Sequence, residues 1–258
     1  MNKGMQGKRV VVTAGAQGIG LAITEAFVAA GAEVHICDVN DDFLANAKAS
    51  FPGVSQSRTD VSNEAQVDAM FAELGSRWGA LDVLVNNAGI AGPTARLEDT
   101  ELGDWDQTLA VNLTGSFLCA RRAVPLIKAA GGGSIVNLSS AAGRLGFPLR
   151  TPYSASKFGV IGLTETWAME LGSSNIRVNA ILPGIVAGDR QERVIAAKAA
   201  SYGIEHEEMR QRLLSRVSLR TMVTAQDIAN QILFICSPAG ATISGQSLSV
   251  CGNVESLG

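Results

Sequence analysis

The amino-acid sequence predicts an α/β protein in which one doubly wound parallel sheet of about seven strands carries helices on both faces. Short runs rich in β-branched residues alternate with longer segments of helical period, as they do in βαβ units. Strands such as Val10–Val12 and Val83–Val85 are apolar throughout, which is typical of parallel strands buried on both faces. No Pro/Ser-rich linker or break in composition divides the chain, so we predict a single domain over residues 1–258.

The first elements alternate in this way from the start of the chain. The apolar run Arg9–Thr13 predicts a buried strand, and the segment after the next glycines predicts a helix at about Gly18–Ala30. The run Glu33–Cys37 predicts a second strand, followed by a short helix at Asp41–Ser50.

The middle of the chain continues the pattern. A weaker strand is expected near Val54–Arg58, before a strongly periodic helix at Asn63–Trp78. The apolar run Asp82–Asn86 predicts the fourth strand, and two helices are expected after it, across Glu101–Val111 and Gly115–Ala130.

The last third contains the remaining strands and one insertion. Strands are expected at Ser134–Leu138 and Ile176–Leu182, with a long helix at about Tyr153–Leu171 between them, and a short last strand at Leu248–Val250. Residues 188–220 form a helical insertion rich in charge.

Composition narrows the classes of function. The chain has 47% hydrophobic residues and a net charge of −3, without a dense Lys/Arg cluster, so we expect no nucleic-acid partner. No apolar stretch is long enough to span a bilayer, and no signal peptide is evident, so we expect a cytoplasmic protein without membrane contact. The four cysteines form no Cys-x-x-Cys pair or Cys/His cluster, so we expect buried reduced thiols and no metal site.

A glycine-rich loop follows the first strand, in the segment Thr13-Ala-Gly-Ala-Gln-Gly-Ile-Gly20. Glycines let a backbone approach a pyrophosphate closely, and the helix N-terminus supplies N–H groups and a positive dipole, as in Rossmann-type folds. An ordinary strand-to-helix turn explains the loop equally well when it is taken alone. Asp38 at the end of the second strand favours the dinucleotide, because an acid there accepts hydrogen bonds from ribose hydroxyls and repels a 2′-phosphate. We therefore expect NAD rather than NADP, although Asp38 alone is also consistent with a solvated turn.

Tyr153 and Lys157 lie four residues apart, on one face of a predicted helix. A phenol has a pKa near 10, and lowering it to about 7 needs roughly 4 kcal/mol of differential stabilisation. Lys157 and a positively charged nicotinamide ring can share that task; chance spacing of a surface Tyr and Lys is the alternative.

Two polar positions lie close to this pair in the predicted fold. Ser139 and Ser140 follow the fifth strand, at the sheet edge where ligands bind, and a hydroxyl there can donate to a substrate oxygen; helix or loop capping is the alternative. Asn112 is polar within an apolar helical stretch, where it serves either as a satisfied buried amide or as the anchor of a proton-relay water.

Taken together, these motifs resemble the short-chain dehydrogenase/reductase family in its compact single-domain branch, over essentially the whole chain. The resemblance implies a catalytic set of Asn112, Ser140, Tyr153 and Lys157, with Tyr153 as general acid/base and Lys157 also a ribose ligand. It implies cofactor contacts at Gly15, Gln17, Gly18, Ile19, Gly20, Asp38, Asp60, Val61, Asn87, Ala88, Gly89, Tyr153, Lys157, Pro183, Gly184 and Val186. It also implies a substrate lid at about 188–220 and a homotetramer formed through Gly115–Ala130 and Tyr153–Leu171.

The chain departs from the family's pattern at two positions. The usual first loop glycine falls on Ala14, and we expect Gly15 to adopt the permissive backbone conformation instead. Gly188 replaces a threonine that often holds the nicotinamide carboxamide, which leaves that contact to the main chain of Val186.

The function expected from these observations is NAD-dependent interconversion of a secondary alcohol and a ketone. The substrate contacts are expected at Ser140, Tyr153 and either Arg144 or Arg150, with a polar or anionic substrate such as a sugar-like polyol. An NADP-linked carbonyl reductase, such as a ketoacyl reductase, and a non-catalytic NAD-binding protein on the same fold are the alternatives.

Overall fold

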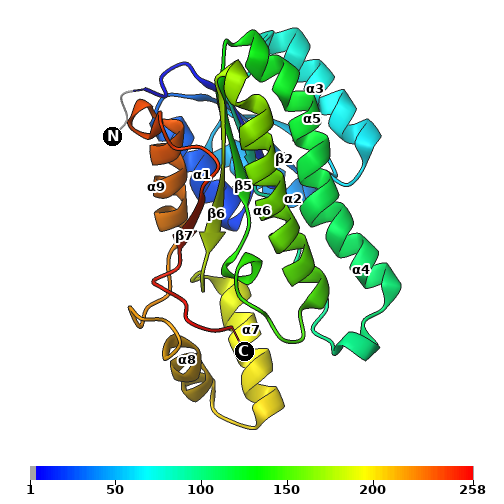
Figure 1. Ribbon diagram of the computed structural model, residues 1–258, viewed down its shortest axis with the longest axis vertical. Helices are drawn as coiled ribbons and strands as arrows, with labels where there is room; N and C mark the ends of the chain where they lie inside the picture. The colour runs from blue at the N-terminus through cyan, green and yellow to red at the C-terminus, as the bar shows by residue number, and fades with distance from the viewer. Residues whose placement is uncertain (1–3, 258) are drawn as a thin grey trace.

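A computed structural model describes residues 4–257, apart from the side chains at 189, 190, 197 and 201, and contains one sheet of seven parallel strands (Figure 1). The strands are β1 (Arg9–Thr13), β2 (Glu33–Asp38), β3 (Ser55–Arg58), β4 (Val83–Asn86), β5 (Gly133–Leu138), β6 (Ile176–Pro183) and β7 (Ser247–Val250). Their order is β3-β2-β1-β4-β5-β6-β7, so the direction of winding reverses between β1 and β4. This confirms the predicted Rossmann-type doubly wound fold, and every predicted strand is present within two residues of its expected bounds.

Helices cover both faces of the sheet. One face packs against α1 (Gly18–Ala29), α2 (Asp41–Ser50) and α9 (Ala225–Cys236), and the other against α3 (Glu64–Trp78), α5 (Gly115–Ala129) and α6 (Thr151–Leu171). The helices α7 (Asp189–Tyr202) and α8 (His206–Leu214) lie beyond the ends of the strands, at the bottom of Figure 1.

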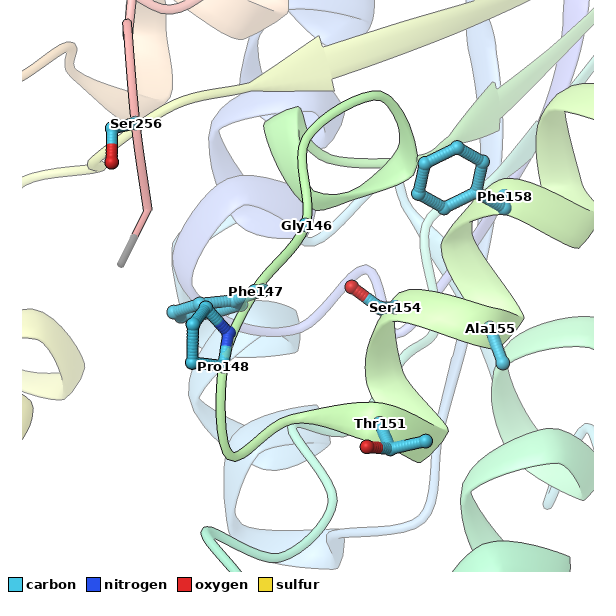
Figure 2. A pocket seen from close by; sticks show the side chains of 8 residues that line it. All are labelled: Gly146, Phe147, Pro148, Thr151, Ser154, Ala155, Phe158 and Ser256. Atoms are coloured by element: carbon cyan, nitrogen blue, oxygen red, sulfur yellow. The ribbon is translucent and has the colours of Figure 1, made fainter. Parts of the chain in front are cut away.

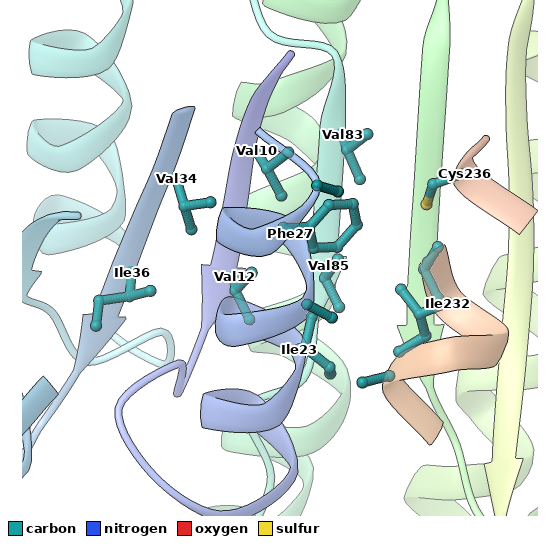
Figure 3. Close-up of a cluster of buried hydrophobic side chains, with 14 of the residues drawn as sticks. Val10, Val12, Ile23, Phe27, Val34, Ile36, Val83, Val85, Ile232 and Cys236 are labelled. Carbon is teal, nitrogen blue, oxygen red and sulfur yellow. The ribbon is translucent and has the colours of Figure 1, made fainter. Parts of the chain in front are cut away.

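The core follows from the alternation of side chains along each strand. Val10 and Val12 point to the face of α1 and α9, where Phe27 and Ile232 meet them (Figure 3), whereas Val11 packs on the opposite face. Removal of a fully buried ring such as that of Phe27 costs about 3–5 kcal/mol, so this layer holds the first helix, and the loop before it, against the sheet.

Two features of the helices differ from the sequence prediction. The helix α9 was not predicted, although Thr224 and Asp227 form a capping box at its start and its apolar residues face the core. The two helices expected after β4 are joined, because a π-helical turn at Ala110–Thr114 connects α4 (Leu102–Leu109) to α5 without a break. Among the described residues, no helix combines the length and apolarity that crossing a membrane requires.

Candidate active site

The ends of β1 and β4 meet at the point where the winding reverses, which is where open α/β sheets bind ligands. Asn87 ties the two ends together, because its Nδ2 donates to the carbonyls of Thr13 and Ala14, each at 3.0 Å. The main-chain N–H groups of Asn87 and Ala88 both donate to Thr13 Oγ1 at 2.9 Å. The segment Asn87–Gly89 therefore lies directly beside the glycine loop, as the cofactor assignment requires.

The backbone of that loop corrects one expectation. Ala14, not Gly15, adopts the left-handed conformation, with φ at +48°. Gly15 is needed for a different reason, since a Cβ there would lie 2.7 Å from Ile36 Cγ2 and 2.9 Å from the carbonyl oxygen of Val12. The loop thus passes so close to β2 that a side chain is excluded at position 15, and the turn itself is made by an alanine at the cost of some strain.

The next residues leave room above the start of α1. Gly18 has a φ of +54°, and a Cβ built there meets no atom within 4 Å. Gln17 is the N-cap but its side chain makes no capping hydrogen bond, and Ile19 packs partly against the core. At Gly20 a Cβ would collide with the carbonyl oxygen of Ala14 at 2.0 Å. The loop thus packs closely at Gly20 but leaves open space at Gly18, at the N-terminus of α1, which suits a pyrophosphate.

Asp38 is 5% exposed at the carboxyl end of β2. Its Oδ1 accepts hydrogen bonds from the N–H groups of Val39 at 2.8 Å and Asn40 at 3.2 Å, but no donor in the described part of the chain reaches its buried Oδ2. An unpartnered buried carboxylate oxygen is costly, so the site fits a ligand with hydroxyl donors, such as an adenosine ribose. Arg58 stands opposite Asp38 on β3, yet its guanidinium pairs with Asp41 at 3.4 Å.

Asp60 and Val61 follow β3, beside the end of β2, where the N–H of Thr59 donates to the carbonyl of Asp38 at 3.0 Å. Oδ1 of Asp60 accepts from both the N–H and the hydroxyl of Ser62, and Val61 is 5% exposed against α5. Both residues are thus held in place by protein contacts at the edge where an adenine would lie.

The opposite end of the crevice is formed after β6. Pro183 ends the strand, and the N–H of Gly184 donates to the carbonyl of Val250 at 3.0 Å. Val186 pairs with Val223 through the carbonyl of Ile185 and the N–H of Ala187, so its own N–H and carbonyl point away from that neighbour. This orientation leaves them available for a nicotinamide carboxamide. Gly188 has a φ of +141°, a conformation that a threonine rarely adopts.

Tyr153 and Lys157 lie near the start of α6, next to the end of β5. Lys157 is 4% exposed, and its Nζ donates to the carbonyl of Leu138 at 2.8 Å while lying 5.7 Å from the centroid of the Tyr153 ring. A Cβ at Gly89 would be 3.3 Å from the same Nζ. The predicted pair is thus brought together at the carboxyl edge of the sheet. The ammonium group of Lys157 lies close to the loop at Gly89, where we expect the ribose of the cofactor.

Ser140 and Ser139 have different surroundings. The hydroxyl of Ser139 donates to the carbonyl of Lys157 at 2.8 Å and so fastens α6 to β5. Oγ of Ser140 accepts from the N–H of Ala142 at 3.1 Å, which leaves its proton to be donated elsewhere. The geometry favours Ser140 over Ser139 for contact with a substrate oxygen.

Asn112 lies within the π-helical turn and is 1% exposed. Its Oδ1 accepts from the N–H of Ile90 at 2.8 Å, and its Nδ2 donates to the carbonyl of Ile90 and to Ser156 Oγ, each at 3.0 Å. The amide is thus satisfied by protein groups and clamps the loop after β4 onto α6. Its main-chain carbonyl accepts a hydrogen bond from Ser116 Oγ at 3.0 Å. π-Turns recur at functional sites.

The two arginines considered for substrate binding make different contacts in the structure. Arg144 is exposed and donates to the carbonyl of Ser247, the first residue of β7, at 2.7 Å, which ties it to the edge strand. Arg150 donates to the carbonyls of Ala91 and Gly92, at 3.3 and 3.4 Å, and lies over the ring of Phe147. Arg150 is therefore the one that stays beside the start of α6.

Two residues near Tyr153 were not found from the sequence. The ring of Phe147 meets that of Tyr153 edge-on, with centroids 6.5 Å apart, and Lys198 of α7 lies 5.8 Å from the Phe147 centroid. A lone Phe in a loop and one of several lysines in a charged helix carry no spacing signal, so only the fold brings them together.

A cavity of about 610 Å³ lies between the loop before α6 and the first turns of that helix (Figure 2). Its lining residues are Gly146, Phe147, Pro148, Thr151, Ser154, Ala155, Phe158 and Ser256. Tyr153 is not one of them, and Figure 2 shows the Phe147 ring on the side of the loop away from Ser154. We do not place the reacting carbon in this cavity, because the polar groups of the site lie outside it.

The other side chains that could carry chemistry are possible metal ligands and cysteine thiols. Among the residues that the structure describes, no group of three or more His, Cys, Asp or Glu side chains is arranged to hold a metal ion. Cys37, Cys119 and Cys236 are buried, and burial raises the pKa of the Cys37 and Cys236 thiols to about 12. These two thiols are thus protonated at neutral pH and are poor nucleophiles.

Comparison with known proteins agrees with this geometry. A family model described as enoyl-(acyl carrier protein) reductase matches residues 13–253. The 3-oxoacyl-[acyl-carrier-protein] reductase FabG of Thermotoga maritima is 36% identical over 254 residues, which cover 97% of this chain and 98% of that protein. The chain belongs to the short-chain dehydrogenase/reductase family. Proteins of this family are oxidoreductases that act on CH–OH groups and the corresponding carbonyls.

Other relatives differ in the substrate and cofactor that their names state. The D-beta-hydroxybutyrate dehydrogenase of Rhizobium meliloti is 33% identical over 255 residues, covering 95% of this chain and 97% of that protein. The structure of NAD⁺-bound xylitol dehydrogenase superimposes with a TM-score of 0.91 at 29% identity, covering 96% of this chain and 99% of that one. A variant actinorhodin polyketide ketoreductase with NADPH superimposes with a TM-score of 0.92 at 29% identity, covering 96% and 97% of the two chains.

Proposed function

We propose that this short-chain dehydrogenase/reductase interconverts a secondary alcohol and a ketone with NAD, and that Tyr153 is its general acid/base. The observation that carries the proposal is the buried Lys157 ammonium group, which the carbonyl of Leu138 holds 5.7 Å from the ring of Tyr153. An ammonium ion in that place can stabilise the negative charge that develops on the phenol oxygen during proton transfer. A merely structural Tyr and Lys would not require the cation to be buried at the sheet edge where ligands bind.

The choice of NAD rests on Asp38. Its unpartnered Oδ2 can accept from the ribose hydroxyls of NAD, whereas the same buried carboxylate would face the 2′-phosphate of NADP. When bound, NAD supplies the nicotinamide ring that accepts the hydride. We assign the ribose and carboxamide contacts to Lys157 and to the main chain of Val186, and the pyrophosphate to the N-terminus of α1.

In the direction of oxidation, Ser140 donates a hydrogen bond to the substrate oxygen and fixes its position. Tyr153 takes the proton of the substrate hydroxyl group at its phenol oxygen, with the charge stabilised by Lys157. A water on the main-chain carbonyl of Asn112 would return that proton to solvent. Each step uses a group near the start of α6, and a polar alcohol such as a polyol suits the surrounding Ser and Arg side chains.

An NADP-linked ketoacyl reductase is the second candidate. It is favoured by the names of two similar proteins, the Thermotoga maritima reductase and the actinorhodin ketoreductase with NADPH. Asp38 weighs against it, since Arg58, which lies opposite Asp38 on β3, pairs with Asp41. A cytoplasmic location and a homotetrameric assembly remain predictions.

The test is a screen of NAD⁺ and NADP⁺ reduction over polyols, hydroxy acids and cyclic alcohols, followed by reduction of the matching ketones. Tyr153→Phe serves as the blank. We expect Tyr153-dependent turnover with NAD⁺ at higher kcat/KM than with NADP⁺. Turnover by the Tyr153→Phe variant at the native rate, or no turnover on any alcohol or ketone despite binding of NADH, would reject the proposal in favour of another chemistry or a non-catalytic NAD-binding protein.

A further inference from the structure

Two cations share one aromatic ring next to the proposed acid/base. The guanidinium carbon of Arg150 and the Nζ of Lys198 each lie 5.8 Å from the centroid of Phe147. The edge-on contact of Phe147 with Tyr153 places this group one ring away from the phenol. The cations come from different parts of the chain, because Arg150 immediately precedes α6 and Lys198 belongs to α7, in the predicted lid.

A third cation lies within electrostatic range of the pair. Burial lowers the pKa of Lys198, and the positive charges of Arg150 and Arg216 lower it further. The loop before α6, α7 and the segment after α8 thus bring like charges near enough to one another to lower the pKa of Lys198. An anion bound among these charges would reduce their mutual repulsion.

The loop after β4 helps to fix the position of Arg150. Arg150 is anchored to the carbonyls of Ala91 and Gly92, in the loop that follows the predicted ribose segment. Arg150 and Lys198 each make further interactions within the chain, so an anion would be bound by exchange of contacts. Guanidinium and ammonium groups that converge in this way are the usual means of binding carboxylates and phosphates.

We propose that Arg150 and Lys198 together bind an anionic end of the substrate while Tyr153 acts on its hydroxyl carbon. This rests on the proposed function and narrows its substrate to an anionic secondary alcohol or ketone, either a hydroxy acid or a phosphate ester. Because Lys198 is carried by α7, the anion links the predicted lid to the loop before α6, and a neutral polyol lacks that link.

The test compares matched anionic and neutral substrates with NAD⁺. 3-Hydroxybutyrate is paired with 3-hydroxybutyramide, and sorbitol 6-phosphate with sorbitol. We expect at least one anionic member to have a kcat/KM about tenfold or more above its neutral partner, which is the effect of one charge-assisted contact. Preference within the first or the second pair distinguishes a carboxylate from a phosphate.

Lys198→Gln is the decisive variant. It should lower kcat/KM about tenfold or more for the anionic substrate, mostly through KM, while changing the neutral one by less than about threefold. Lys198→Arg should retain most of the native kcat/KM for the anionic substrate. Arg150→Gln should lower that kcat/KM as Lys198→Gln does. Arg212→Gln is the control, since Arg212 is an exposed cation of α8 that pairs with Glu208.

Equal kcat/KM for anionic and neutral substrates, or an equal effect of Lys198→Gln on both, would overturn the inference while leaving the proposed function intact. If nothing is turned over, the proposed function fails, and calorimetric titration of the NADH-bound protein with 3-hydroxybutyrate and with sorbitol 6-phosphate decides the anion site separately. Binding weakened about tenfold by Lys198→Gln supports the site, and absent or unchanged binding rejects it.

Discussion

Two buried polar side chains of β2 differ in how they are satisfied. Both ring nitrogens of His35 have hydroxyl partners, Ser55 Oγ at 3.0 Å and Ser57 Oγ at 3.1 Å, whereas Asp38 Oδ2 is left without one. A buried polar group is normally paired, so the exceptions call for an explanation. The hydrogen bonds of His35 are satisfied within the fold, whereas we propose that Asp38 Oδ2 accepts a hydrogen bond from a bound ribose.

Substitution of Asp38 tests the cofactor preference. The native protein should bind NAD at least about ten times more tightly than NADP, because a carboxylate next to the 2′-phosphate costs several kcal/mol. Asp38→Ala should narrow that ratio by about tenfold or more, measured from the two dissociation constants. Asp42→Ala removes an exposed acid of α2 and should leave the ratio unchanged. Tighter binding of NADP than of NAD by the native protein would contradict the assignment.

His35 predicts how stability depends on pH. Burial, together with the nearby Arg77, lowers the pKa of its imidazole from 6.5 to about 4. As the pH falls from 6.5 towards 4, His35 binds a proton in the unfolded chain but stays neutral in the folded protein. The free energy of unfolding therefore falls by up to about 3 kcal/mol in that window.

Denaturant titrations at pH 7 and pH 4.5 measure this loss. His35→Gln should show a clearly smaller drop between the two pH values than the native protein, whatever its stability at pH 7. The exposed His206 is the control, and His206→Gln should keep the native drop. An identical drop in the native protein and His35→Gln would show that the acid sensitivity arises elsewhere.

At the scale of single elements, the glycine loop shows what the sequence could and could not predict. The motif predicts a turn that opens a helix, and this is correct. The sequence alone does not reveal which of Ala14 and Gly15 makes the left-handed turn, because that depends on the distance from the loop to Ile36 of β2. The choice is fixed by packing between strands, which has no local signature.

The loop supplies two opposite stability predictions. Ala14→Gly should raise the free energy of unfolding by about 0.5–1 kcal/mol, because relief of the left-handed strain exceeds the added freedom of the unfolded chain. Gly15→Ala should lower it by about 1–3 kcal/mol, because its Cβ would overlap Ile36. Thermal unfolding measures both, with a shift of about 2–4 °C per kcal/mol for a domain of this size. A destabilised Ala14→Gly protein would contradict the strain at position 14.

The helices also contain features that the sequence predicts and features that it does not. The spacing of Tyr153 and Lys157 is local and was sufficient to place both on one face of α6. The π-turn at Asn112 was not predicted, since it arises where the amide bonds to Ile90 and Ser156, both far away in the sequence. The start of α9 does have a local signal in the sequence, because Thr224 and Asp227 form a capping box.

At the scale of the whole molecule, the winding of the sheet decides what meets at the site. It brings β1, β4, β5 and the start of α6 to one edge, which the alternation of strands and helices predicts. It does not predict that Arg150 and Lys198 both approach the ring of Phe147, since that contact joins a loop to the charged insertion. Pairings of this kind depend on loop and lid conformation, for which the sequence has no periodic signal.

The outer surface of α5 and α6 leads to a prediction about assembly. Phe117 and Phe158 are 42% and 48% exposed on these helices, where the family resemblance places a subunit interface. Light scattering after size exclusion should give about four times the 26.8 kDa chain mass, since symmetric assembly would bury these rings. The double variant Phe117→Glu/Phe158→Glu should be smaller, whereas Leu219→Glu, at an exposed position after α8, should not be. A monomeric native protein would refute the assembly.

The proposed reaction depends on exchange of the substrate proton by Tyr153, which lies beside the buried ammonium group of Lys157. Single-turnover formation of NADH by Tyr153→Phe, together with the dissociation constant of NADH, tests it most directly. We expect the rate to fall by at least about a hundredfold while NADH affinity stays within about twofold of the native value. A rate close to that of the native protein, or a loss explained by weaker NADH binding, would contradict it.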